Sequence, residues 1–168
     1  MALFSPEFNS LEDLFLEQIE DLYDAEHRII RALPKMIEAA QDPDLKRALD
    51  QHLAETRNQV DRLDTIFRSL NKAPERETCE AMKGLIREGE DMVGAKGSPE
   101  VRDAAIIAAA QRVEHYEMAG YGTARSLAQA LGHSEAARLL ESTLQEEKNA
   151  DQILTQVAER SVNVHALR

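Results

Sequence analysis

Several features that would indicate other classes of protein are scarce in this sequence. It contains one cysteine, Cys79, so no disulfide can form within the chain, and we expect a reducing compartment. No stretch approaches the roughly 20 consecutive apolar residues that a membrane-spanning helix needs. Residues 1–10 lack the basic segment followed by an apolar one that marks a secretory signal peptide. Together these absences predict a cytoplasmic protein.

Basic residues are also in the minority. The chain has 20 Lys and Arg against 31 Asp and Glu, a formal net charge of −11. A surplus of negative charge argues against nucleic acid or an anionic membrane as the partner, because both repel an acidic surface. The same surplus is compatible with attracting cations.

Glycine and proline are few, at seven and five residues, and continuous β-branched runs are absent. The chain is instead rich in Ala, Leu, Glu, Gln and Arg, which favour helices. We therefore expect an all-α protein, and a length of 168 residues suits a single domain, 1–168, with a sizeable core.

Apolar periodicity and capping residues predict four long helices and a short one. The first helix begins near Asn9 or Ser10, and the others cover about residues 43–70, 75–92, 98–131 and 134 onward. The bundle spans about residues 9–160. The short helix lies in a crossover, about 71–98, that links two helical hairpins, and we expect an irregular tail after residue 160.

The inner stripes of these helices are apolar at both ends and polar in the middle. In the second helix, His52, Thr56 and Gln59 stand between leucines. In the last long helix, Glu147 occupies the place of a leucine, and Asp151 follows four residues later on the same side. This pattern predicts a polar site buried inside a bundle.

The two halves of the chain correspond to each other. The segment AEHR around Glu26 resembles VEHY around Glu114, and the segments around Glu55 and Glu147 also align. In that register Gln59 matches Asp151. We interpret the halves as two copies of one helical hairpin, each supplying one lone inner glutamate and one helix with two polar groups.

Four carboxylates cannot all remain ionised in a dry core without a cation. We therefore predict a pair of divalent or trivalent metal ions, bridged by two of the glutamates. Oxygen-rich ligation suits iron or manganese, and also magnesium or calcium. For Glu117, His52, Gln59 and Asp151, purely structural roles in hydrogen bonds or ion pairs remain alternatives. The candidate ligands are Glu26, Glu55, Glu114, Glu147, Asp151, Glu117, Gln59 and His52.

The segments LEDLFLEQIEDLYDAEHRI, HLAETRNQVDRL, VEHYEMAGYG and LLESTLQEEKNADQIL resemble the YciF/YciE family of bacterial ferritin-like proteins, from about residue 11 to 157. The resemblance implies a rubrerythrin-like four-helix bundle with a crossover helix, a homodimer and a link to stress responses. It also implies the ferritin-like ligand set, which falls on Glu26, Glu55, Glu114 and Glu147. Ferritin-like sites usually place a histidine three residues after the second and fourth of these glutamates, but here Asn58 and Ala150 stand there.

Our first hypothesis is therefore a cytoplasmic, stress-related protein that binds two iron or manganese ions and reacts with oxygen or peroxide as an oxidase or peroxidase. The alternative is a non-catalytic structural or interaction bundle whose polar core is vestigial. Storage of iron in a cage fits less well, because the crossover is short. The sequence alone leaves open whether the protein is an enzyme.

Overall fold

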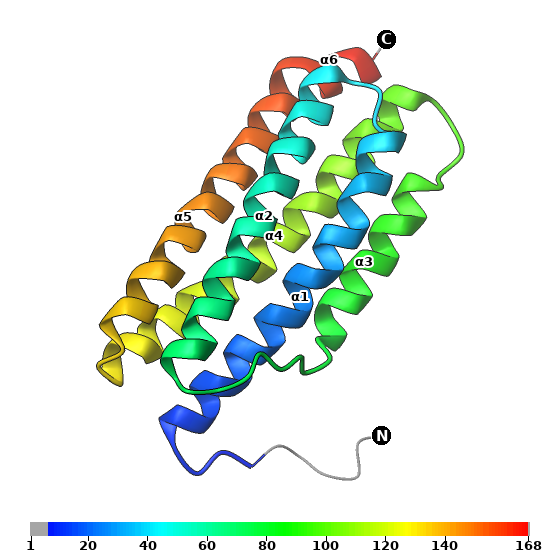
Figure 1. Ribbon diagram of the computed structural model, residues 1–168. Helices are drawn as coiled ribbons and strands as arrows, with labels where there is room; N and C mark the ends of the chain where they lie inside the picture. The colour runs from blue at the N-terminus through cyan, green and yellow to red at the C-terminus, as the bar shows by residue number, and fades with distance from the viewer. Residues whose placement is uncertain (1–6, 168) are drawn as a thin grey trace.

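The computed structural model describes residues 7–167 (Figure 1), and every regular element in this range is helical. The all-α prediction is thus confirmed. The long helices are α1 (Leu11–Ala39), α2 (Pro43–Ser69), α4 (Pro99–Ala130) and α5 (Ser134–Val157). The shorter α3 (Glu80–Val93) precedes α4, and a π-helical segment (Ala158–Val162) and α6 (Asn163–Ala166) follow α5.

Capping residues account for where the helices begin. The Ser10 hydroxyl accepts a hydrogen bond from the Asp13 amide at 3.1 Å, and the Asp42 carboxylate accepts one from the Asp44 amide at 2.8 Å. Ser98 caps α4 in the same way. Pro43 and Pro99 occupy first-turn positions, where their missing N–H is not needed. These three starts agree with the prediction.

The four long helices run side by side (Figure 1). Helix α1 packs against α2 and α4, and α5 packs against the same two helices from the other side. The hairpins α1–α2 and α4–α5 therefore enclose a shared interior. Helix α3 lies outside this group and packs against α1 and α4.

The apolar core falls into two clusters, one towards each end of the long helices. One cluster contains Phe15, Phe67 and Leu140, and the other contains Ile29, Leu49 and Ile107. Between the positions that belong to the two clusters lie buried polar residues, namely Thr56 and Gln59 on α2, Glu114 and Glu117 on α4, and Glu147 on α5. Glu26 on α1 and His52 on α2 lie next to this boundary. The predicted stripes with a polar middle thus combine into one polar layer in the bundle interior.

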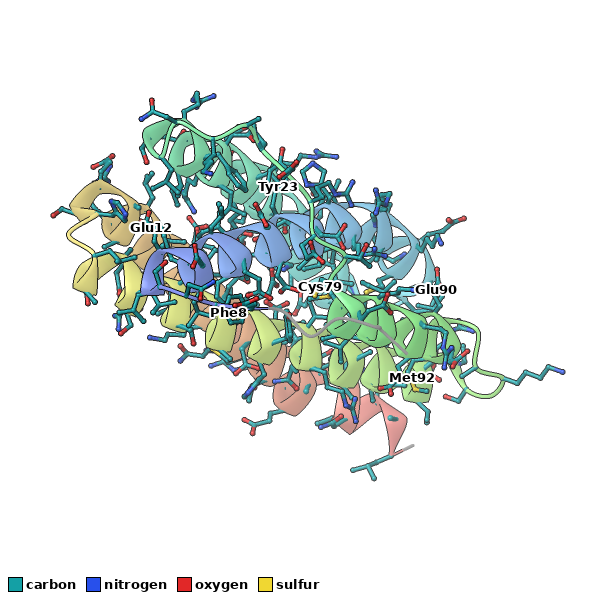
Figure 2. All side chains as sticks on the ribbon, turned by 90° about the horizontal axis from the view of Figure 1, so that it is seen from below. Phe8, Glu12, Tyr23, Cys79, Glu90 and Met92 are labelled. Atoms are coloured by element: carbon teal, nitrogen blue, oxygen red, sulfur yellow. The ribbon has the colours of Figure 1, made fainter. Side chains whose placement is uncertain are left out.

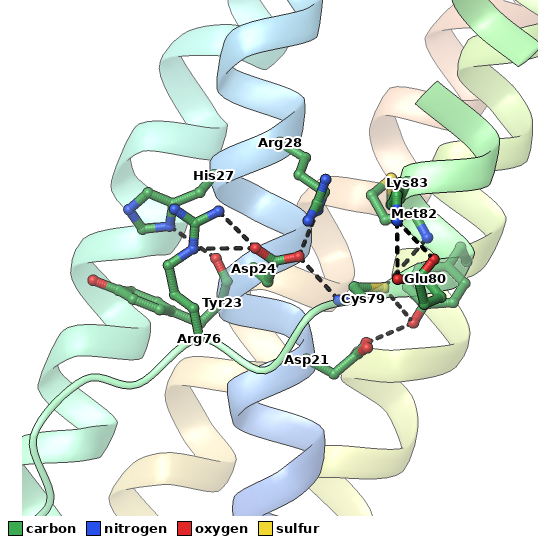
Figure 3. A network of polar contacts seen from close by, with 11 residues as sticks. Asp21, Tyr23, Asp24, His27, Arg28, Arg76, Cys79, Glu80, Met82 and Lys83 are labelled. Atoms are coloured by element: carbon green, nitrogen blue, oxygen red, sulfur yellow. Dashed lines mark hydrogen bonds and ion pairs between the residues drawn. The ribbon is translucent and has the colours of Figure 1, made fainter. Parts of the chain in front are cut away.

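Two predictions about irregular segments need correction. Helix α3 begins at Glu80, not near Glu75, and the segment before it has no regular structure and is tied to α1. The Asp24 carboxylate on α1 accepts hydrogen bonds from the Arg76 guanidinium at 2.6 Å and the Cys79 amide at 2.9 Å (Figure 3). The tail expected to be irregular is helical from Ala158 to Ala166.

Candidate metal centre

Four buried side chains from three helices converge in the polar layer. They are His52 on α2, Glu114 and Glu117 on α4, and Glu147 on α5. Each offers one donor atom, and these atoms all lie within 4.8 Å of one another. Glu114 and Glu117 reach the same place because residues three apart share a helix face.

His52 faces the carboxylates directly. Its Nε2 atom lies 3.4 Å from Glu114 Oε1 and 3.9 Å from Glu147 Oε2. Burial lowers the pKa of His52 to about 4, so the imidazole is neutral at pH 7. Neither ring nitrogen has a hydrogen-bond partner among the described residues. A neutral imidazole with a free nitrogen is the form that binds metal ions.

The carboxylates contain oxygens that nothing in the described part of the chain satisfies. Both oxygens of Glu117 and one oxygen each of Glu26, Glu114 and Glu147 are buried and lack a hydrogen-bond donor. Leaving a buried acceptor unpaired costs about 1–3 kcal/mol for each group, and more when the group is charged. A cation among these oxygens would remove that penalty, so the donor set fits a metal ion.

Burial and the closeness of the carboxyl groups to one another also shift their pKa values. Burial, with the charges of neighbouring carboxylates, raises the pKa of Glu26, Glu114 and Glu117 well above the usual range. Burial also raises the pKa of Glu147 to about 7. Without a cation, these groups therefore hold their protons to a higher pH than ordinary glutamates do. Binding of a metal ion would displace the protons, because the ligating form is the carboxylate.

Further hydrogen bonds position the edges of the cluster. Gln59 on α2 donates to Glu147 and, at 3.1 Å, to Glu146. Glu146 is itself held by two hydrogen bonds of 2.6 Å from Arg62. On the opposite side, the hydroxyl of the fully buried Tyr121 donates to Glu26.

The structure does not bring Glu55 into this cluster. Glu55 is half-buried and accepts a hydrogen bond of 2.9 Å from Gln51, one turn earlier on the outer side of α2. The buried face of α2 runs through His52, Thr56 and Gln59, and Glu55 is rotated about 100° from Thr56. Aligning the halves by the Glu55 segment therefore placed a carboxylate one position away from the inner face.

Asp151 also lies outside the cluster. Its carboxylate accepts a hydrogen bond of 3.0 Å from Gln111 and lies 3.4 Å from the exposed His115 imidazole. The other predicted candidates are all buried in the polar layer: Glu26, His52, Gln59, Glu114, Glu117 and Glu147.

Tyr121 was not predicted as part of the site. Its place on the inner stripe of α4, two turns after Glu114, was a signal for it.

Comparison with known proteins identifies the family to which the chain belongs. Residues 10–167 match the family described as "Domain of unknown function (DUF892)". The chain belongs to this family. It is 45% identical over 158 residues to the protein YciF of Escherichia coli strain K12, covering 94% of this chain and 95% of that protein. The predicted membership in the YciF/YciE family is thus confirmed.

Solved structures agree with this assignment. The crystal structure of the E. coli stress protein YciF superposes with a TM-score of 0.89 and 44% identity, over 93% of this chain and 99% of that one. YcfI of Rhodopseudomonas palustris gives a TM-score of 0.88 and 46% identity over the same shares. A protein of Xanthomonas campestris, with 22% identity and a TM-score of 0.72, shares the fold.

In the described part of the chain, no helix is long and apolar enough to cross a membrane.

Proposed function

We propose that this chain is a ferritin-like metalloprotein that binds two ions of iron or manganese inside a four-helix bundle. The observation that carries the proposal is the convergence of one imidazole and three carboxylates, all buried, with donor atoms within 4.8 Å of one another. Carboxyl groups buried this closely need either protons or a cation to balance their charge, and a metal ion inside a helical bundle would supply the cation.

The first ion would be held by His52, Glu114, Glu117 and Glu147. The second ion would use the oxygens of Glu26 and Glu117 that have no hydrogen-bond donor among the described residues. Gln59 donates a hydrogen bond to Glu147 at the edge of the site. Glu55 and Asp151 remain candidates at the periphery, where each would need a new side-chain rotamer.

An iron pair would supply electrons for the reduction of dioxygen or peroxide. The chain's own residues would then exclude bulk water and handle protons. Tyr121 donates its hydroxyl hydrogen to Glu26, and burial and the Glu26 charge raise the pKa of this phenol well above its usual range. Tyr121 therefore keeps its proton at neutral pH and orients the Glu26 carboxylate.

The stress-related role, the homodimer and the cytoplasmic location extend this proposal. The E. coli relative is described as a stress protein, and a role in stress would suit chemistry on peroxide. Size-exclusion chromatography with light scattering would test the dimer, which a mass near 18.8 kDa would contradict.

A structural bundle with a vestigial polar core is the alternative. It is favoured by the hydrogen bonds from Gln59 to Glu147 and from Tyr121 to Glu26, and by the raised pKa values that let carboxyl groups stay neutral. This alternative predicts that chelators leave stability unchanged.

Metal content separates the two functions. Protein purified without added metal or chelator is analysed by mass spectrometry, and the metal-free form is titrated anaerobically with ferrous ions. We expect about two ions per chain in the wild type and loss of binding in a Glu114→Ala, Glu147→Ala variant. No metal in the wild type after ferrous loading would reject the metalloprotein.

A further inference from the structure

An apolar groove opens on the outside of the bundle between α1, α3 and α4. Its volume is about 250 Å³, and its walls include Met36 on α1, Ile86 and Val93 on α3, and Val113 on α4. This volume lies just below the roughly 300 Å³ at which ordinary ligand pockets begin, so a bound molecule would be small.

The groove leads towards the candidate metal centre. A second, smaller cavity of about 20 Å³ lies inward of it, and the two share the side chains of Met36, Ile86 and Val113 as walls. At its inner end this cavity is lined by His52 and Glu114. Apolar side chains that line both cavities therefore separate the groove from two of the proposed ligands.

The charges along the groove indicate what could bind there. Among its described lining residues, the charged side chains are Lys35 and Glu90, and they pair with each other at 2.8 Å on the exposed rim. Glu90 lies on α3 beside α1 (Figure 2). Among the described residues that line the groove, no unpaired charge remains to compensate an ionic ligand, so an ion would be desolvated without compensation.

The opposite approach to the site is different. A cavity of about 10 Å³ on the side of α2 and α5 is also lined by His52 and Glu114, but Gln51 and Glu55 stand beside it. Apart from these polar residues, the walls of that cavity are apolar and include Leu49, Ile153 and Leu154. The groove between α1, α3 and α4 is the larger of the two, and its charged lining residues are paired with each other, so it suits an uncharged molecule.

We propose that the groove between α1, α3 and α4 binds a small, uncharged, apolar organic molecule and holds it one layer of apolar side chains away from His52 and Glu114. If the bound molecule is a substrate, that role rests on the proposed metal centre. Binding of the molecule in the groove does not depend on the metal centre. Burial of its carbon atoms against Met36, Ile86 and Val113 would drive association.

Gly89 offers a way to close the groove. A Cβ atom built at Gly89 meets only the Ala109 Cβ, at 3.8 Å, so a side chain is tolerated there and extends into the groove. Gly84, on the same helix, is exposed, does not line the groove, and has nothing within 4 Å of a built Cβ. Gly89→Leu and Gly84→Leu are therefore a matched pair that makes the same chemical change.

The test is a fluorescence titration of the metal-free full chain with the neutral dye 1-aminoanthracene. We expect saturable binding to the wild type and to Gly84→Leu, and binding at least about tenfold weaker for Gly89→Leu, a change of ~1.4 kcal/mol. Ala32→Phe narrows the groove from α1 and should weaken binding in the same way, which keeps the test decisive if Gly89→Leu misfolds.

Equal affinity of the wild type and both groove variants would overturn the proposal, as would the absence of saturable binding. A wild-type dimer that binds no dye and dissociates in Gly89→Leu would show instead that a second copy covers the groove. Metal content is measured on the same samples. Dye binding without metal uptake would reject the proposed function alone, and metal uptake without dye binding would reject the groove alone.

Discussion

The Nε2 atom of His52 lies 3.4 Å from Glu114 Oε1 in the middle of the bundle, and both side chains are almost completely buried. Burial lowers the pKa of His52 to about 4, which keeps the imidazole neutral, and burial with the charge of Glu147 raises the pKa of Glu114 well above its usual range. Under the proposed function, a metal ion would bind the unprotonated nitrogen of the neutral imidazole without displacing a proton, whereas at Glu114 it would compete with any bound proton.

Removal of His52 should weaken metal binding. His52→Ala takes away the imidazole donor of the converging set, and we expect a loss of at least about tenfold in affinity for Mn²⁺ by isothermal titration calorimetry. His115→Ala is the control, since His115 follows Glu114 directly on α4 but is 66% exposed. Equal affinity of the two variants would show that His52 is a structural histidine.

Stability of the metal-free protein should fall as the pH rises above 6.5. The pKa values of Glu114 and Glu117 are raised, mainly by burial, so the folded state keeps protons that the unfolded state releases. Their contribution is fully present below the unfolded pKa of about 4.5 and is lost as the pH rises through the folded pKa. The expected loss is about 1.4 kcal/mol per pH unit for each retained proton.

His52 has the opposite dependence, which sets the pH range for this measurement. Its pKa is lowered from 6.5 to about 4, so its contribution is present above 6.5 and is lost as the pH falls towards 4. Urea unfolding between about pH 6.5 and 8.5 therefore isolates the carboxyl groups. A Glu114→Gln, Glu117→Gln variant should show a smaller slope, and identical slopes would contradict the raised pKa values.

Asp24 should matter for stability although it lies outside the site. Its carboxylate accepts hydrogen bonds from Arg28, Arg76 and the Cys79 amide, and so ties α1 to the segment before α3 (Figure 3). We expect Asp24→Asn to lower the free energy of unfolding by about 1–3 kcal/mol. Glu80→Gln, which removes an exposed partner of Lys83, should change it by less than about 0.5 kcal/mol.

The Asp24 contribution should disappear in acid. Burial tends to raise the pKa of Asp24, but the hydrogen bonds from Arg28, Cys79 and Arg76 outweigh it and hold the pKa below 3.8. A lowered carboxyl pKa stabilises the folded state above the unfolded pKa and stops doing so as the pH falls through the folded value. The difference between wild type and Asp24→Asn should therefore shrink below about pH 4, and a difference that persisted at pH 2 would contradict this.

Cys79 should resist alkylation in the folded protein. Its thiol is buried, its sulfur lies 3.0 Å from the Tyr116 hydroxyl, and burial raises its pKa to about 11. The thiolate is the reactive form, so little of it exists at neutral pH. Labelling with iodoacetamide, followed by mass spectrometry, should proceed only when urea unfolds the chain. Rapid labelling in buffer would show that the segment before α3 opens readily.

Much of the fold could be predicted because helix signals are local. Ser10, Asp42 and Ser98 cap their helices as their sequence contexts indicate, and polar residues within apolar stripes marked the buried layer. The start of α3 could not be predicted, because it depends on a contact between Asp24 and residues some 50 positions away. A buried aspartate within a helix carries no local signal of its partners.

The sequence predicted which helix faces carry the candidate site, but it did not always predict the individual residues. Glu26, Glu114 and Glu147 lie on the inner face as predicted, and so does His52. Glu55 was predicted on that face because the two halves were aligned by sequence similarity. It lies one residue away from the face, because the burial pattern differs from that alignment by one position. Periodicity places Tyr121 on the inner stripe of α4, but its hydrogen bond to Glu26 joins two helices and could not be predicted from that stripe.

The most direct test of the metal centre is anomalous diffraction from crystals of the full chain grown with Mn²⁺. The proposed function predicts a strong anomalous peak among His52, Glu114, Glu117 and Glu147, with a second peak towards Glu26. An interior without any anomalous peak, together with Mn²⁺ bound only at exposed surface carboxylates, would contradict it and favour the structural bundle.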